Sequence, residues 1–181
     1  MKRITHIRNK LLLIFAVVLF SICTTFASTD KNTENQKSIP DVDQKAPGFS
    51  LPGLGEQIEL AKLEGSVVYV DFWASWCKPC KKSFSWMNAM QDRYGKDGFK
   101  IIAINLDSTR QDANTFLEQY PASFSIAFDP DGYTAELYQV KGMPSSYLIS
   151  RDGNIAYRHL GFRPNDKQLL EAAIEHMVRS L

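Results

Sequence analysis

The chain has 181 residues, with 21 Lys and Arg, 20 Asp and Glu, and three cysteines. That length supports one domain with a full hydrophobic core and is short for two. The formal charge of +1 at pH 7 leaves no surplus of cations to neutralise phosphates, so nucleic acid is not an expected partner.

The first 27 residues have the composition of a targeting segment. MKRITHIRNK carries four Lys or Arg and no acid, and the following LLLIFAVVLFSICTTFA has no formal charge. Residues 1–27 are therefore predicted to be a signal peptide, cleaved after Ala27, or an N-terminal membrane anchor whose apolar part is residues 11–27. Either alternative predicts an extracytoplasmic protein of the bacterial periplasm, soluble after cleavage or tethered to the membrane.

Cysteine usage points to redox chemistry. Ile22 precedes Cys23, where bacterial lipoprotein signals carry a small residue, so a lipid anchor at Cys23 is disfavoured. Beyond the leader only Cys77 and Cys80 remain, and the rest of the chain carries 17 basic and 20 acidic side chains. A disulfide that spans two residues closes almost no loop, so this pair is a poor structural staple.

A flexible linker is predicted at residues 28–45, where Ile39 and Val42 are the only sizeable apolar side chains. The folded domain is predicted at residues 46–181. Its strands are expected at 57–60, 66–73, 99–107, 125–128, 145–150 and 155–162, because these runs are rich in β-branched and aromatic residues or alternate in polarity.

Helices are predicted between these strands. The first follows the cysteines over 81–95 and ends at Gly95, and the second covers 108–120 with Ser108 as its cap. A short helix at 133–140 and a final helix at 166–181 complete the pattern. Strands separated by helices, followed by a hairpin and a closing helix, predict an α/β domain with a mixed sheet covered on both faces.

The cysteine pair follows a buried strand and opens a helix. Cys77 is expected at the carboxyl end of the strand, where free helix N–H groups and the helix dipole favour the thiolate. Cys80, nearly one turn further on, is expected to lie deeper and to resolve a mixed disulfide formed at Cys77. This cycle needs no cofactor other than the Cys77–Cys80 disulfide itself.

Three neighbouring positions are expected to support that chemistry. Pro79 fits the first turn of the helix, and Lys78 is expected to tune the thiolate because it lies between the sulfurs. Asp71 lies in the buried strand, where desolvation raises a carboxyl pKa toward neutrality. We therefore expect Asp71 to exchange a proton with the buried thiol.

Other uses of the cysteine pair fit the sequence less well. Zinc needs four ligands, and outside the leader the chain offers one cysteine pair with His159 and His176, so no metal is expected. Covalent haem attachment requires His directly after the second cysteine, where Lys81 stands. A thiol peroxidase is disfavoured because Asp71, rather than proline, stands six residues before Cys77.

The motifs VDFWASWCKPC and GMPSSYLISRDGNI resemble the two signatures of the thioredoxin fold. With the preceding APGFSLPGLGEQIELAKLEG, the chain over about 46–178 is similar to the TlpA/ResA-like thiol-disulfide oxidoreductases, including their N-terminal extension. The resemblance implies that Pro144 is a cis proline, that the Met143 backbone pairs with substrate, and that Trp76 belongs to the redox-tuning segment.

The resemblance implies a protein-disulfide reductase that acts on disulfide-bearing client proteins and is re-reduced by a membrane thiol electron donor. Ser83 and Ser85 depart from the subfamily glutamate and from the helix-kinking proline of many thioredoxins, which weakens an assignment to cytochrome c maturation. A disulfide-forming oxidant of the same fold remains an alternative. So does a tethered copper chaperone, for which His159 is the only candidate distant ligand.

Overall fold

The computed structural model of the chain describes residues 44–180. The predicted leader, residues 1–27, and residues 28–43 of the predicted linker lie outside the described residues. Between residues 44 and 180, no helix is both long enough and apolar enough to cross a membrane.

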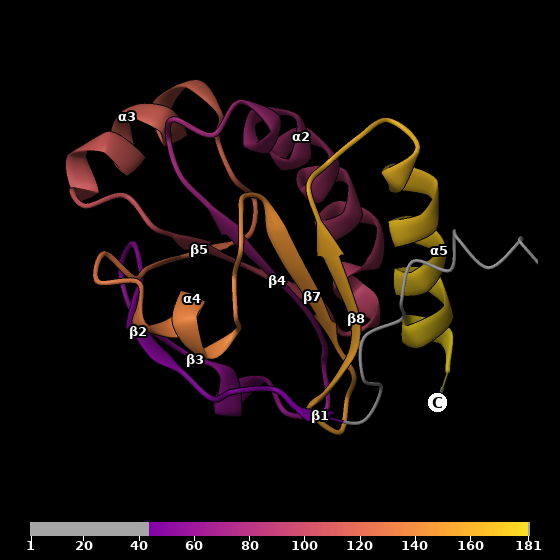
Figure 1. Cartoon of the computed structure of the whole chain (residues 1–181). Helices are drawn as coiled ribbons and strands as arrows, with labels where there is room; N and C mark the ends of the chain where they lie inside the picture. The colour runs from indigo at the N-terminus through magenta and orange to yellow at the C-terminus, as the bar shows by residue number, and fades with distance from the viewer. Residues whose placement is uncertain (1–43, 181) are drawn as a thin grey trace, which may run out of the picture. The chain divides into compact units, whose positions relative to one another are not determined.

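A six-stranded mixed sheet lies at the centre of the described region, with the strand order β1-β8-β7-β4-β5-β6 (Figure 1). Strands β4, β5 and β6 are parallel, whereas the pairs β4–β7, β7–β8 and β8–β1 are antiparallel. The strand bounds are Gln44–Lys45 (β1), Val67–Trp73 (β4), Phe99–Asn105 (β5), Ser125–Phe128 (β6), Ser145–Ile149 (β7) and Asn154–Leu160 (β8). A separate hairpin pairs β2 (Ser50–Pro52) with β3 (Gln57–Glu59).

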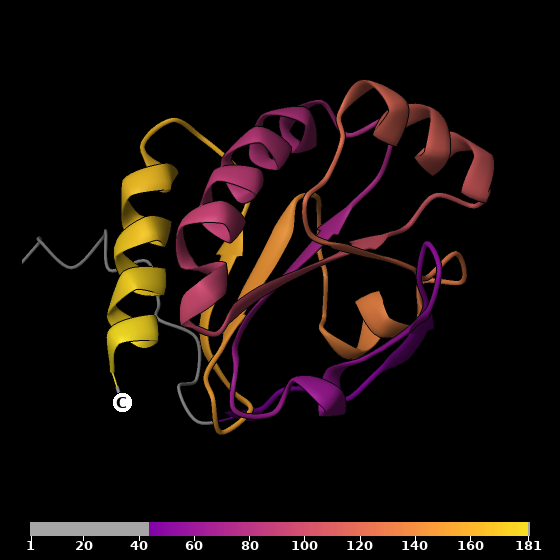
Figure 2. The same cartoon turned by 180° about the vertical axis from the view of Figure 1, so that it is seen from behind.

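Helices cover both faces of this sheet, which confirms the predicted α/β architecture. Apolar side chains of α2, α3 and α5 pack on one face, and α4 packs with the β2–β3 hairpin on the other (Figures 1 and 2). The helix bounds are Lys78–Tyr94 (α2), Arg110–Gln119 (α3), Tyr133–Leu137 (α4) and Asp166–Arg179 (α5), with short 3-10 turns at Leu60–Leu63 (η1) and Gly95–Asp97 (η2).

The central strand β4 is buried along its whole length because both of its faces are covered. Tyr69 and Trp73 point to the face that carries α2, α3 and α5, whereas Val70 and Phe72 point to the opposite core. Asp71 falls in this strand at a position that alternation assigns to the α2 face. Its carboxyl group is therefore placed in the larger of the two cores.

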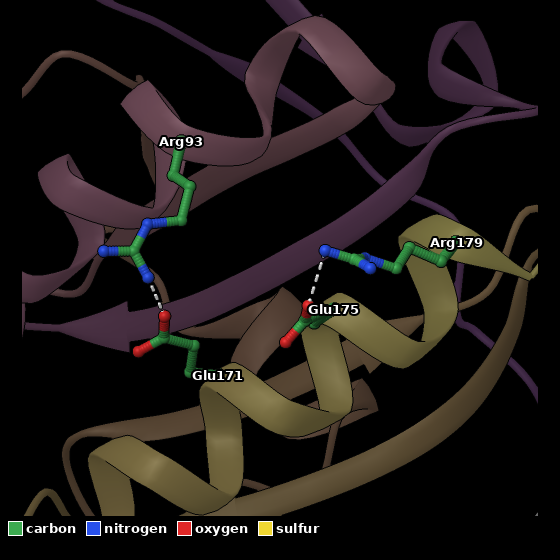
Figure 3. Close-up of polar contacts among 4 residues, drawn as sticks. All are labelled: Arg93, Glu171, Glu175 and Arg179. Carbon is green, nitrogen blue, oxygen red and sulfur yellow. Dashed lines mark hydrogen bonds and ion pairs between the residues drawn. The ribbon is translucent and has the colours of Figure 1, made fainter.

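The α2 and α5 helices lie side by side on that face, and an ion pair between surface side chains connects them (Figure 3). Arg93 of α2 forms an ion pair with Glu171 of α5, and Glu175 pairs with Arg179 within α5 at 2.7 Å. These side chains are largely exposed, so each pair contributes little to stability. Burial of the apolar side chains of Leu170, Ile174 and Val178 supplies most of the free energy that holds α5 against the core.

The structure confirms the predicted end of the first helix and corrects the predicted cap of the second. Gly95 is the C-cap residue of α2, as predicted, although its conformation is right-handed. It begins η2, which ends at the left-handed Gly98, with φ of 84°. The cap of α3 is Thr109 rather than Ser108, and its side chain accepts a hydrogen bond from the backbone N–H of Asp112. The error places the start of α3 at the first suitable residue in the sequence.

The predicted boundary between linker and domain is also too late by two residues. Gln44 and Lys45 form β1, which pairs with Ile155 and Asn154 of β8. The backbone of any residue can complete a sheet edge, so the polar side chains that suggested a linker did not exclude a strand there. The β2 strand was likewise not predicted, because its three residues carry no clear alternation.

Candidate active site

The two cysteines lie where β4 leads into α2. Cys77 is the N-cap residue of α2, with extended backbone angles, and its N–H donates to the carbonyl of Ala74. A disulfide joins Cys77 to Cys80, whose Cα atoms are 5.4 Å apart. Cys77 retains 4% exposure and Cys80 none. The predicted order of depth is therefore confirmed, with Cys77 nearer the surface.

A buried carboxylate holds the loop before Cys77. Asp107 accepts hydrogen bonds from the backbone N–H of Ser75, at 3.0 Å to Oδ2, and from the Ser75 hydroxyl, at 3.0 Å to Oδ1. The side-chain amide of Asn105 donates to Asp107 Oδ2 at 2.8 Å, and Asn105 Oδ1 accepts from the Asp107 N–H. This network fixes the carboxyl end of β5 against the active-site loop.

Sequence reasoning missed Asp107. The strand predicted at 99–107 ends at this residue, and a polar residue at the end of a buried parallel strand lies at the edge of the sheet where α/β proteins place functional groups. Because β5 is the parallel neighbour of β4, its end had to approach the cysteine loop. That signal could have identified Asp107 once the strand order was known.

Asp71 is 1% exposed, and its Oδ2 has no hydrogen-bond partner among the described residues. Desolvation raises the pKa of its carboxyl well above the usual range of an aspartate. Tyr69 and Trp73, two residues to either side on the same strand, belong to the same core cluster as Cys77 and Cys80. The structure therefore places Asp71 on the face of the sheet that the cysteine pair covers.

The remaining residues of the cysteine segment differ in exposure. Trp76 is among the most exposed large apolar side chains described, and Lys78 is exposed at the start of α2. Pro79 lies in the first turn of α2, as predicted. Lys81 points toward α3, where its ammonium group lies 5.4 Å from the ring centre of Tyr120.

The loop before β7 lies next to the cysteine turn. The Met143–Pro144 peptide bond is cis, as the resemblance implied. Ser145 pairs with Phe72 of β4, so Met143 and Pro144 lie beyond the end of β4, where the cysteine segment begins. Met143 packs against the core cluster that contains both cysteines. The Pro144 carbonyl accepts a hydrogen bond from the Gly161 N–H. Part of the hydrogen-bonding capacity of this carbonyl is therefore already used within the fold.

The two serines that replace family residues have different environments. Ser83 is buried, and its hydroxyl donates to the Cys80 carbonyl at 2.9 Å. Ser85 is exposed on α2. Neither side chain offers a titratable group to the cysteines, whereas Asp71 is a buried acid on their face of the sheet.

Comparison with known proteins identifies the family. A model of the AhpC/TSA family matches residues 42–158. The chain belongs to the AhpC/TSA family. The thiol-disulfide oxidoreductase ResA of a Bacillus cereus strain is 33% identical over 143 residues, which cover 78% of this chain and 82% of that protein. The predicted resemblance to ResA-like proteins is thus confirmed.

Solved structures agree with this AhpC/TSA assignment. A protein assigned as thiol:disulfide interchange protein DsbE from Chlorobium tepidum is 52% identical, with a TM-score of 0.75, and covers 78% of this chain and 99% of its own. A protein assigned as a thioredoxin from Neisseria meningitidis is 26% identical, with a TM-score of 0.66 and coverages of 76% and 93%. The chain is a thiol-disulfide oxidoreductase with a thioredoxin-like fold.

Proposed function

We propose that this protein reduces disulfides of client proteins outside the cytoplasm through Cys77 and Cys80. The observation that carries the proposal is the placement of the pair: Cys77 is the N-cap residue of α2 and keeps some exposure, while Cys80 is fully buried behind it. Free N–H groups at the helix start stabilise a thiolate at Cys77. In this proposal Asp71 takes the proton of Cys80, which is supported by its burial on the face of the sheet that the cysteines cover.

The reaction then proceeds in two exchanges. The Cys77 thiolate attacks one sulfur of a client disulfide, so that a bond between Cys77 and the client forms and the client bond breaks. Cys80 gives its proton to the Asp71 carboxylate and attacks the Cys77 sulfur, which forms the Cys77–Cys80 disulfide and releases the second client thiol. Two electrons pass to the client, and a thiol donor at the membrane returns the protein to the dithiol state.

Client binding is assigned to the surface around the cysteines. Trp76 is exposed beside Cys77, and Met143 precedes the cis proline on the adjacent loop. An extended client segment would pair with the Met143 backbone, while Trp76 contacts its apolar side chains. Lys78 and Pro79, between the two sulfurs, set the redox potential together with the helix N-terminus.

The test is reduction of insulin disulfides by the reduced protein. Cys77→Ser should abolish the activity, and Cys80→Ser should accumulate a mixed disulfide on Cys77 because the resolving thiol is missing. Ser85→Ala, on the exposed side of the same helix, is the matched control and should retain full activity. Insulin reduction that survives Cys77→Ser would overturn the proposal.

The direction of electron flow has its own measurement. Equilibration with glutathione should give a reduction potential closer to about −270 mV, typical of thioredoxin, than to about −120 mV, typical of a strong oxidant. A value near the second figure would assign the protein to disulfide formation instead. Apocytochrome c trapped on Cys77 of the Cys80→Ser variant in the native host would place the protein in cytochrome c maturation.

Export is part of the same proposal. Residues 1–27 act as the signal peptide or anchor, and residues 28–43 connect the leader to the folded domain. Relatives with the same printed activity match over most of the domain, which supports a common use of the cysteine pair. Cell fractionation, together with N-terminal sequencing of the mature protein, separates cleavage after Ala27 from retention in the membrane.

A further inference from the structure

A titratable pair, the buried His159 and the partly exposed Asp166, lies on the α2 face of the sheet and has no part in the exchanges described above. His159 of β8 is 2% exposed, and its Nε2 lies within ion-pair distance, 3.0 Å, of Asp166 Oδ2 at the start of α5. Neither imidazole nitrogen makes a hydrogen bond to another described residue, so a proton reaches His159 only after a side chain or a water molecule moves into contact with it. The Asp166 carboxylate also accepts the backbone N–H of Arg163 at 2.7 Å. Burial of an imidazole beside a carboxylate is costly compared with apolar packing, so its presence needs a reason.

Strand register connects this pair with Asp71. Asp71 of β4 is opposite Ser146 of β7, and Ser146 is opposite His159 of β8. Residues opposite each other on adjacent strands point to the same face. The three side chains therefore form one row across the sheet, and all three are buried.

Tyr69 lies beside this row. It is two residues before Asp71 on β4 and points to the same face. Burial raises the pKa of its phenol, the Asp71 charge raises it further, and a hydrogen bond with Ser146 lowers it. The charge of Asp166 also acts on Tyr69. Ser146 thus lies between Asp71 and His159 in the row, and Tyr69, beside Asp71, is close enough to Ser146 and Asp166 for both to act on its phenol.

The row leads from a closed interior toward solvent. Asp71 is 1% exposed, and the His159 side chain is equally enclosed, whereas the Asp166 side chain retains 15% exposure. An acid as enclosed as Asp71 can change its protonation state only if a proton has a route in and out. Hydroxyl, phenol and imidazole groups can each accept one proton and pass another on.

We propose that the His159–Asp166 pair is the solvent end of a proton path that serves Asp71 through Tyr69 and Ser146. The proposal rests on the proposed function, in which Asp71 takes the proton of Cys80. In each cycle Cys80 loses one proton to Asp71, and one proton leaves through His159 to water at Asp166. The path carries no electrons, and the neutral groups end each cycle as they began.

The charged and titratable groups around His159 come from three elements. Tyr157, on its own strand, stacks on the imidazole at a ring distance of 6.3 Å. Asp71 and Tyr69 approach from β4, and Asp166 approaches from α5. His159 and Asp166 are positioning residues in this scheme, because neither is placed against the reacting sulfurs.

The test measures the resolving step alone. A mixed disulfide is prepared between Cys77 and a model peptide thiol, and peptide release is followed by stopped flow as a function of pH. His159→Gln and Asp166→Asn should each slow release at neutral pH by about tenfold, somewhat less than the full effect of a group that transfers the proton directly. The attack of Cys77 on a fresh disulfide should keep its rate.

The controls separate proton transfer from structural support. His176→Gln, on the exposed side of α5, should leave the resolving step unchanged. Imidazole in the buffer should restore part of the rate of His159→Ala, which a loss of packing would not allow. If His159→Gln and Asp166→Asn both release peptide at the wild-type rate with the same pH profile, the path is overturned.

Asp71→Asn distinguishes failure of this inference from failure of the proposed function. Slow release in Asp71→Asn with normal release in His159→Gln overturns the path and leaves the role of Asp71 intact. Normal release in Asp71→Asn overturns both the path and the proton-carrier role. Persisting insulin reduction in Cys77→Ser overturns dithiol exchange itself.

Discussion

If Asp71 carries the proton as proposed, stability and reactivity should depend on pH in opposite ways. Its carboxyl is buried, and desolvation raises its pKa. The native state therefore holds the proton more tightly than the unfolded chain does, so stability is full below the usual aspartate pKa and falls as pH rises toward the raised value. Under the proposed function, the resolving step uses the ionised form of Asp71 and should gain rate over the same range.

Replacing Asp71 with Asn should separate these two effects. The amide carries no charge at any pH, so the free energy of unfolding of the reduced protein should rise by about 1–3 kcal/mol at pH 8 and depend less on pH. Urea unfolding at several pH values measures this change. A variant that is less stable than the wild type at pH 8 would contradict the assignment of a raised pKa.

Asp107 differs from Asp71 because both of its carboxylate oxygens accept hydrogen bonds. In Asp107→Asn, an amide N–H would replace one acceptor facing Ser75, which should cost about 1–3 kcal/mol of unfolding free energy. The loop before Cys77 should also become more mobile, with greater hydrogen exchange at Ser75. Asp131→Asn, in an exposed turn, should change neither quantity.

At the level of elements, the turn between η2 and β5 depends on a residue without a side chain. Gly98 has φ of 84°, and a Cβ there would lie 3.0 Å from the Arg151 guanidinium. Gly98→Ala should therefore cost about 1–2 kcal/mol through backbone strain. The matched variant Gly48→Ala, where a Cβ meets nothing within 4 Å, should be close to neutral in the same thermal unfolding assay.

The strands and helices themselves were largely predictable. The run from Val67 to Trp73 and the apolar spacing after Cys80 reflect interactions between near neighbours in the chain, so the sequence displays them directly. The cap of α3 was predicted less well, as Thr109 shows, because a helix end depends on which of several suitable residues the tertiary structure selects.

Across the whole molecule, Arg151 joins segments that are distant in sequence. Its guanidinium donates to the backbone carbonyls of Gly65 at 2.9 Å, Asp97 at 3.2 Å and Val178 at 3.0 Å. One side chain thus connects the β7–β8 turn to the entrance of β4, to η2 and to the end of α5.

Arg151→Ala should lower the free energy of unfolding by about 2–4 kcal/mol, because three carbonyl groups lose a charged donor together. Chemical denaturation of the oxidised protein measures the loss. The exposed Lys100→Ala provides the control for removal of a positive charge, and an equal loss in that variant would show that charge rather than the connection is responsible.

The sequence by itself determined the chemistry: a cysteine pair at a strand-to-helix junction, a buried acid six residues upstream, and a proline that matches the thioredoxin signature. These features depend on the spacing of residues within short segments, and the local backbone geometry of a strand or helix fixes where such residues lie relative to one another. Tertiary structure alone decided that Asp107 holds the cysteine loop, that β1 completes the sheet edge and that His159 shares a row with Asp71. Strand order and register bring those residues together, and both are set by packing of the whole chain, which no short stretch of sequence contains.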